Sequence, residues 1–167
     1  MNMSNIIIKE AEIADIPIIL SFINKLAEYE KLSNEVIATN EIIKESLFSE
    51  HSNAHSVIGF LNNKPVTFAI YFFNYSTFLG KKGLYLEDLF VLSEFRNNGV
   101  GKQMLKYLAN IAIQNNCGRF EWSVLDWNKP AIEFYKKLGA ELKTEWITTR
   151  ISGKNLENLA NLNINKN

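Results

Sequence analysis

Residues 84–102 read LYLEDLFVLSEFRNNGVGK, and this stretch decides the fold. Its first part, 84–92, is apolar and β-rich and predicts a long strand, but the adjacent acids Glu87 and Asp88 interrupt it. A turn of asparagine and glycine follows and leads into a helix whose apolar residues recur at three- and four-residue spacings as far as Asn116. The stretch therefore predicts a strand, a turn and an amphipathic helix, with two acids that a buried strand does not ordinarily carry.

Upstream of this stretch the sequence predicts a strand, two helices and a hairpin. Residues 6–8 are three isoleucines, typical of a short strand. Asp15 is placed to cap a helix that has Pro17 in its first turn, and Thr39 is placed to cap a second helix. Residues 56–74 contain two β-rich runs around an NNKP turn, which indicates a hairpin.

Downstream of it the sequence predicts a strand over 119–125, a helix that begins at Asn128 and a last strand in TEWITTRI, 144–151. The whole order is strand, helices, three strands, helix, strand, helix, strand, which is a mixed α/β domain. The asparagine-rich end, about 162–167, loses its apolar spacing and is expected to fray. With no linker or internal repeat, we expect one domain over 1–167.

Composition excludes several classes of function. The 167 residues are 47% hydrophobic and 22% charged, which suits one soluble globular domain. Eighteen basic residues balance eighteen acidic ones, so no overall field attracts nucleic acid, and none is expected as a partner. Charged residues interrupt the apolar N-terminus before a signal peptide or membrane span accumulates, and the single Cys117 forms no internal disulfide. We therefore expect a cytoplasmic protein with no membrane association.

The turn RNNGVG, Arg96–Gly101, has the composition of a phosphate-binding loop. Its glycines permit positive backbone torsion, so successive amide N–H groups can point into one concavity at the start of a helix. The side chains of Arg96 and Lys102 would add positive charge. A plain connecting turn is the alternative, and neither the dinucleotide fingerprint nor the P-loop pattern fits.

The pattern R-x-x-G-x-G between a strand and a helix resembles the pyrophosphate-binding signature of the GCN5-related N-acetyltransferase (GNAT) superfamily, whose donor is acetyl-CoA. Residues 84–91 and 127–140 closely resemble diamine acetyltransferases of the spermidine/spermine type, and 26–32 and 75–81 are similar less specifically. The resemblance implies the GNAT fold, an α/β architecture with helices around a central mixed twisted sheet. That sheet would be splayed between the strands 84–92 and 119–125, with CoA in the gap.

The resemblance also implies a reaction: an amine attacks the thioester directly in a ternary complex, without an acyl-enzyme. An alkyl ammonium ion must first lose a proton, because its reference pKa is about 10.4. Glu87 would serve as the base through water, with Asp88 attracting the cation, and Tyr135 would protonate the leaving thiolate. From spacing alone, Glu87 and Asp88 could instead be a solvent-facing pair near a bulge or an edge, and Tyr135 a core aromatic.

The implied donor site uses main-chain groups more than side chains. Strand residues would hydrogen-bond the pantetheine arm, and the glycine loop would surround the pyrophosphate. Asn128 would contact the same arm, although it could equally act only as a helix cap. The full set is Leu89, Phe90, Val91, Arg96, Asn97, Asn98, Gly99, Val100, Gly101, Lys102, Asn128 and Ala131.

The implied acceptor site is acidic and aromatic, with Tyr29, Glu30, Glu87 and Asp88 as its residues. However, Ser76-Thr77-Phe78 occupies the place where polyamine-acetylating relatives usually have an acid followed closely by tryptophan. A shorter diamine, a lysine analogue such as thialysine, or another small primary amine is therefore as plausible as a polyamine. An acetyltransferase of protein N-termini or lysines, and a non-catalytic acyl-CoA sensor, remain alternative functions.

Two other features carry less weight. His51 and His55 have a spacing that can chelate a metal, but they have no third ligand in pattern, so no metal is expected. Cys117 lacks a histidine partner in any recognised pattern and is read as structural. The resemblance also implies a homodimer, in which the last strand would take part.

Overall fold

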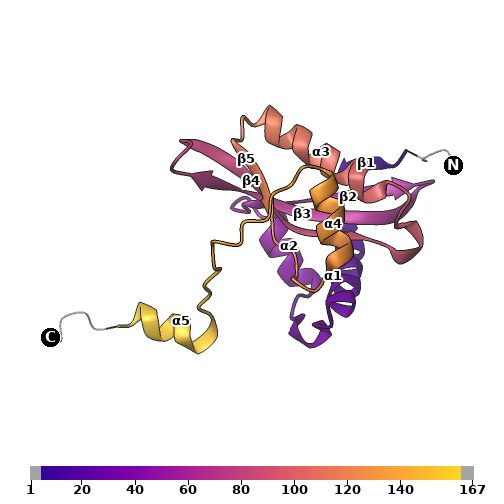
Figure 1. Ribbon diagram of the computed structural model, residues 1–167. Coiled ribbons are helices and arrows are strands. Elements are labelled where there is room, and N and C mark those ends of the chain that lie inside the picture. Colours follow the sequence, from indigo (N-terminus) through magenta and orange to yellow (C-terminus); the bar gives the residue numbers. More distant parts are fainter. Residues whose placement is uncertain (1–4, 163–167) are drawn as a thin grey trace. The chain divides into compact units, whose positions relative to one another are not determined.

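The computed structural model describes residues 5–162, and the chain divides into two units, Met1–Ser123 and Val124–Asn167. The first unit holds a sheet in the order β1-β2-β3-β4-β5 (Figure 1). Adjacent strands from β1 to β4 pair antiparallel, and β5 pairs parallel with β4. The strands are β1 (Ile7–Glu10), β2 (Ala54–Leu61), β3 (Lys64–Ser76), β4 (Lys81–Val91) and β5 (Arg119–Trp122). The predicted mixed α/β architecture is confirmed.

The sheet splays where β4 and β5 part. Their pairing runs from Gly83 with Arg119 to Leu86 with Trp122, where β5 ends, while β4 continues to Val91. The expected strand over 119–125 is thus too long at its C-terminal end, since parallel pairing stops at Trp122. The predicted opening between these two strands is confirmed.

A β-bulge explains the two acids in β4. Ile70 of β3 pairs with Asp88 and Tyr71 pairs with Leu86, so Glu87 is an extra residue on β4. A bulge leaves one residue outside the ladder and bends the strand. Glu87 is exposed there, while Asp88 re-enters the ladder opposite Ile70 and is half-buried.

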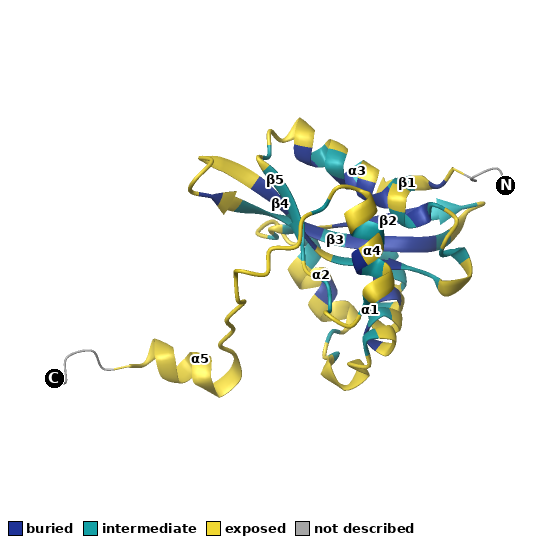
Figure 2. Ribbon diagram, in the orientation of Figure 1, coloured by how far each residue is buried: buried dark blue, intermediate teal, exposed yellow. Residues whose placement is uncertain are grey.

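Helices cover both faces of this sheet (Figure 1). α1 (Ile16–Glu30) and α2 (Asn40–Phe48) pack against one face through Phe22, Phe68 and Phe90, whose rings stack or meet edge to face. α3 (Val100–Gln114) packs against the other face, where Met104 and Leu108 are fully buried. Buried residues accordingly concentrate on the central strands and the inward sides of the helices (Figure 2).

The helix caps are close to those expected from sequence. Thr39 Oγ1 accepts a hydrogen bond from the Ile42 N–H at 3.3 Å, as predicted for the start of α2. Asp15 is the N-cap residue of α1, with Pro17 in the first turn, but its carboxylate accepts from the Glu12 N–H at 2.9 Å instead. A short 3₁₀ turn, Ile13–Asp15, precedes α1 and draws the carboxylate backwards.

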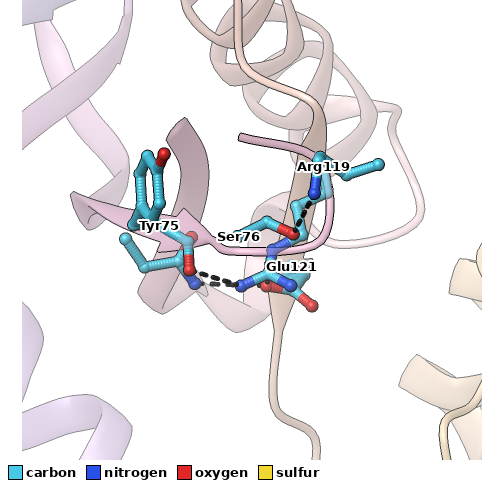
Figure 3. Close-up of polar contacts among 6 residues, drawn as sticks. Tyr75, Ser76, Arg119 and Glu121 are labelled. Atoms are coloured by element: carbon cyan, nitrogen blue, oxygen red, sulfur yellow. Dashed lines mark hydrogen bonds and ion pairs between the residues drawn. The ribbon is translucent and has the colours of Figure 1, made fainter. Parts of the chain in front are cut away.

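Polar side chains hold β5 beside β4 just before the splay. Arg119 Nε lies 2.8 Å from Glu121 Oε2, and Asn74 of β3 donates to the same oxygen at 3.1 Å. The Arg119 guanidinium also reaches the Tyr75 carbonyl at 3.4 Å, so these groups link β3 to β5 across β4 (Figure 3). Gly83 of β4 lies beneath them, and a Cβ there would collide with Asn74 Oδ1.

The second unit contains α4 (Lys129–Lys137) and α5 (Gly153–Ala160). The predicted strand in 144–151 is wrong: this described segment forms no strand, and Trp146 and Ile147 are 76% and 87% exposed. A strand needs a partner for its backbone groups, and here none of the described residues provides one. The sequence reading missed α5. The tail expected to fray lies, except for Leu162, outside the described residues.

Candidate active site

One edge of β4 presents main-chain groups at the splay. The Leu92 N–H donates to the Val66 carbonyl at 3.0 Å, and hydrogen-bonded pairs alternate along an antiparallel ladder. The N–H and C=O groups of Leu89 and Val91 therefore point away from β3, beyond the end of β5. We call this edge, from Glu87 to Val91, the donor edge.

Phe90 differs from its two neighbours. By the same alternation its main chain faces β3, and its carbonyl accepts a 2.8 Å hydrogen bond from the buried hydroxyl of Thr67. Its side chain is only 7% exposed and packs in the core against Phe22. Of the three residues expected to hold the pantetheine arm, Leu89 and Val91 thus present main-chain groups to the splay, and Phe90 supports them from within.

The glycine loop that follows β4 has the predicted backbone conformation. Asn97 and Gly99 have positive φ values of 62° and 80°, and Gly99 is the N-cap residue of α3. No side chain of the described residues caps this helix, whose first amide N–H groups belong to Val100, Gly101 and Lys102. Uncapped N–H groups and the positive end of a helix dipole suit a diphosphate.

Arg96 is turned toward the acceptor side of the site. Its Nε donates to the Val91 carbonyl at 2.9 Å, on the donor edge. Its guanidinium carbon lies 4.5 Å from the ring centroid of Tyr29, next to the C-terminal residue of α1, and 5.2 Å from that of Phe90. The arginine thus joins the end of α1 to the end of β4.

The acids expected at the acceptor site influence one another. Burial and, after it, the negative charges of Glu87 and Glu30 together raise the pKa of Asp88 to about 6. Burial also raises the pKa of Glu30, the last residue of α1. Three carboxyl groups from α1 and β4 therefore share one local field, and Asp88 changes protonation near neutral pH.

Tyr85 is a residue that sequence reasoning missed. It pairs with Phe72, whose ring centroid is 5.1 Å away, and it lies on the same sheet face as Asp88 because Phe72 and Ile70 share a face of β3. Its hydroxyl is 2.8 Å from the Ser123 hydroxyl, just past the end of β5. Strict alternation along LYLED places Tyr85 and Asp88 on opposite faces, so only the bulge could have revealed this pair.

The segment that departs from the polyamine pattern forms the β3–β4 turn. Ser76 is buried, and its hydroxyl accepts from the Leu79 N–H at 3.3 Å, so it serves the turn itself. Phe78 is 95% exposed. Figure 3 shows Ser76 beside Tyr75 and the Arg119–Glu121 pair.

The two expected site residues of α4 belong to the second unit. Tyr135 is half-buried, with its ring 5.4 Å from that of Phe134. Asn128 Oδ1 accepts from the Ala131 N–H at 3.4 Å, which is the helix cap considered from sequence. Its side-chain oxygen is therefore already engaged, and a contact with a ligand would use the amide N–H₂ group.

Neither His55 nor Cys117 lies in a catalytic arrangement. The His55 ring stacks on Tyr71 at 5.1 Å, and within residues 5–162 there is no group of three or more potential metal ligands. Burial raises the pKa of the Cys117 thiol, which disfavours the nucleophilic thiolate. Over the same described range, none of the helices has the length and apolarity needed to cross a membrane.

Comparison with known proteins shows which protein family the chain belongs to. Residues 22–140 match the model of the Acetyltransferase (GNAT) family. The chain belongs to this family and is an N-acetyltransferase, for which the family implies acetyl-CoA as donor. The resemblance inferred from the sequence is confirmed.

Several relatives of the chain are named as acetyltransferases of small molecules. The chain is 37% identical to thialysine N-epsilon-acetyltransferase of Sus scrofa, over 95% of this chain and 99% of the relative. The protein of that name from Mus musculus is 35% identical with the same coverage. An L-ornithine N5-acetyltransferase of Arabidopsis thaliana is 42% identical over 58% of this chain and 42% of its own length.

Solved structures confirm the fold. An integron cassette protein from V. cholerae superposes with a TM-score of 0.78 at 31% identity, covering 93% of this chain and 97% of its own. An aminoglycoside acetyltransferase from a soil metagenomic sample gives a TM-score of 0.75 at 17% identity, covering 89% and 97%. At that lower identity the likeness shows the fold alone.

Proposed function

We propose that this protein transfers the acetyl group of acetyl-CoA to a primary amine of a small cationic molecule, with a lysine analogue of the thialysine kind as the first candidate. The observation that carries the proposal is the acidic cluster of Glu30, Glu87 and Asp88 next to the donor edge. Such a cluster attracts an ammonium ion to a strand whose main chain can hold a thioester arm. The names of the relatives that the chain matches over nearly its full length agree with this class of acceptor.

The acids supply the proton acceptor that the reaction needs. An ammonium group must lose a proton before it attacks, and a base works best when its pKa is near the working pH. Asp88, with its pKa of about 6, meets this requirement, while Glu87 is exposed on the bulge and can relay a proton through water. The sequence assigned the base to Glu87; we assign the role to the pair.

The chemistry balances without a covalent enzyme intermediate. The amine nitrogen forms a bond to the acetyl carbon, its proton passes to the carboxylate pair, and the carbon–sulfur bond breaks with its electrons left on sulfur. Tyr135 then donates its phenolic proton to the thiolate and regains a proton from water. Holding both reactants in line contributes roughly 7 to 11 kcal/mol toward the barrier.

Donor binding uses the main chain of β4 and of the loop. Leu89 and Val91 hydrogen-bond the pantetheine arm, as a β5 residue would if the pairing continued. The amide N–H groups from Asn97 to Lys102 surround the pyrophosphate. Phe90 and Arg96 support this surface rather than contact the donor, and Asn128, near Ala131, contributes its side-chain amide N–H₂ group.

The residues of the β3–β4 turn favour a short acceptor. A polyamine needs a second anionic site far from the reacting nitrogen, and Ser76 and Phe78 offer no charge there. Tyr85 and Phe72 instead provide an aromatic wall beside Asp88, suited to one cation and a short alkyl chain. We therefore expect a preference for short amines over spermidine and spermine.

An acceptor screen tests the proposal. Purified protein with acetyl-CoA is offered thialysine, ornithine, short diamines, spermidine and peptides, and release of CoA thiol is followed. Fast turnover of a small amine supports the proposal; turnover of peptides only would assign a protein acetyltransferase. Binding of CoA without turnover of any amine would assign an acyl-CoA sensor.

Three substitutions then test the roles. In Asp88→Asn the acidic limb of the kcat/KM profile, near pH 6, should disappear; if it disappears only in Glu87→Gln, the base is Glu87 alone. Tyr135→Phe should lower kcat while the affinity for CoA is kept. If Tyr135→Phe turns over as fast as the parent, Tyr135 is not the acid.

A homodimer is part of the same proposal. Its support is the large apolar side chains exposed over residues 140–162 of the second unit: Leu142, Trp146, Ile147, Ile151, Leu156, Leu159 and Leu162. A second copy would remove this surface from water. Sedimentation equilibrium should give twice the chain mass of 19.1 kDa, and a monomer at micromolar concentration would contradict the proposal.

A further inference from the structure

Arg96 contacts one residue of the proposed donor site and one residue of the proposed acceptor site. Its Nε–H is hydrogen-bonded to the Val91 carbonyl at 2.9 Å, and that carbonyl lies on the donor edge. Its guanidinium group lies 4.5 Å from the ring of Tyr29, which belongs to the proposed acceptor site. The side chain is half-buried between these groups, with Phe90 at 5.2 Å.

These contacts fix the plane of the guanidinium group. A hydrogen bond from Nε orients the group relative to β4, and the rings of Tyr29 and Phe90 hold it through cation–π attraction. Phe90 is itself fixed in the core, so Tyr29 is the only one of these partners with substantial exposure, at 36%. The arginine therefore transmits the position of the strand end to the ring of Tyr29.

The contact with Val91 also sets what the donor edge offers. Because Arg96 already occupies the Val91 carbonyl, this residue is left to present its N–H group, while Leu89 presents both of its groups. A donor arm bound at this edge, and the loop 97–102 that directly follows Arg96, would therefore bind best when Arg96 is in place. Tyr29 helps to keep it there.

We propose that Arg96 is a positioning residue that couples the two substrate sites, holding Tyr29 for the acceptor and the Val91 edge for the donor. The inference rests on the proposed function, because Tyr29 is an acceptor-site residue only within it. Coupling between sites is reciprocal in binding, so a change at Tyr29 alters the affinity for CoA, and the donor tightens the acceptor site.

A double-mutant cycle measures this coupling. Arg96→Gln removes the cation but keeps an N–H donor for the Val91 carbonyl, and Tyr29→Leu removes the ring. The CoA dissociation constant is measured by calorimetry for the parent, both single variants and the double variant. Tyr29→Phe keeps the ring, and Tyr75→Leu removes an exposed tyrosine remote from Arg96; both serve as controls.

Tyr29→Leu should weaken CoA binding by about threefold to thirtyfold, the range of a partly desolvated cation–π contact. In the Arg96→Gln background the same change should alter CoA affinity less than twofold, and both controls should stay within twofold of the parent. If Tyr29→Leu leaves CoA affinity unchanged, Arg96 does not couple the sites. The same holds if the double variant loses CoA affinity by the product of the fold-changes of the two single variants. Should Arg96→Gln fail to fold, the effect of Tyr29→Leu on CoA affinity alone decides.

The acceptor constant provides the second readout. With the best amine of the screen, Arg96→Gln should raise the acceptor KM about threefold to thirtyfold, with a smaller change in kcat, and a purely structural role would change neither selectively. If no amine is turned over, the proposed function fails, yet the calorimetric cycle still decides the coupling. The two failures are therefore distinguishable.

Discussion

Asp88→Asn should stabilise the protein while it impairs acetyl transfer. Asp88 is a half-buried carboxyl group whose pKa rises from 3.8 to about 6, first through burial and then through the charges of Glu87 and Glu30. The folded protein therefore holds this proton more tightly than the unfolded chain does. Ionised Asp88 destabilises the fold, and the neutral amide of asparagine removes that penalty.

The size and the sign follow from linkage. Between the two pKa values the folded state binds more protons than the unfolded state, so the stability contributed by this group falls as pH rises. The penalty is absent below pH 3.8 and fully present above pH 6, where it reaches about 3 kcal/mol. At pH 5 it is close to half of the full value.

Urea unfolding of the parent and Asp88→Asn at pH 8 and pH 5 measures this difference. At pH 8 the variant should gain up to about 3 kcal/mol, which corresponds to roughly 6 to 12 °C in Tm for a chain of this size. The gain should shrink to about half at pH 5. Glu45→Gln, the same loss of charge at an exposed site of α2, is the control and should change stability by less than about 0.5 kcal/mol. A variant no more stable than the parent at pH 8 would refute the reasoning.

Three further substitutions test the frame around the site by chemical unfolding. Gly83→Ala should destabilise the protein by about 1 to 3 kcal/mol, because its Cβ collides with Asn74 Oδ1, whereas Gly80→Ala in open space should show only the strain of a positive φ. Thr67→Val should lose about 1 kcal/mol with the buried hydrogen bond to the Phe90 carbonyl; an unchanged stability would mean that this bond contributes nothing. Thr39→Ala should lose about 1 kcal/mol with the cap of α2, and Thr39→Ser should retain it.

Local signals in the sequence were sufficient for most of the first unit. The NNKP turn gives a hairpin whose Asn62 and Asn63 have positive φ values of 50° and 62°. Thr39 caps α2, and Gly99 begins α3 with the positive φ expected of a glycine turn. Each of these features depends on a few neighbouring residues, so composition and spacing could predict it.

Features that depend on pairing partners could not be predicted in the same way. Spacing offered a bulge or an edge at Glu87 and Asp88 only as one alternative. The register of β3 against β4 is what defines the bulge, and it places Tyr85 and Asp88 on one face. The contact of Arg96 with Tyr29 joins residues 67 positions apart, and no local pattern encodes it. The prediction of a strand in 144–151 was wrong for the same reason. The local sequence favours a strand, but a strand also needs a pairing partner from elsewhere in the chain.

β4 departs from a regular strand at the same places where the chemistry is proposed. A regular β4 would carry no extra residue at Glu87, no buried acid at Asp88 and no main chain beyond its partner β5. Each departure is unfavourable for folding, and the ionised Asp88 opposes folding because burial and the neighbouring carboxylates raise its pKa. Sites of function are where sequences tolerate such local conflicts. If packing alone had determined β4, Asp88 would be an apolar residue like Ile70 opposite it, and an Asp88→Asn variant that is more stable but slower would be direct evidence that the acid is kept for the amine.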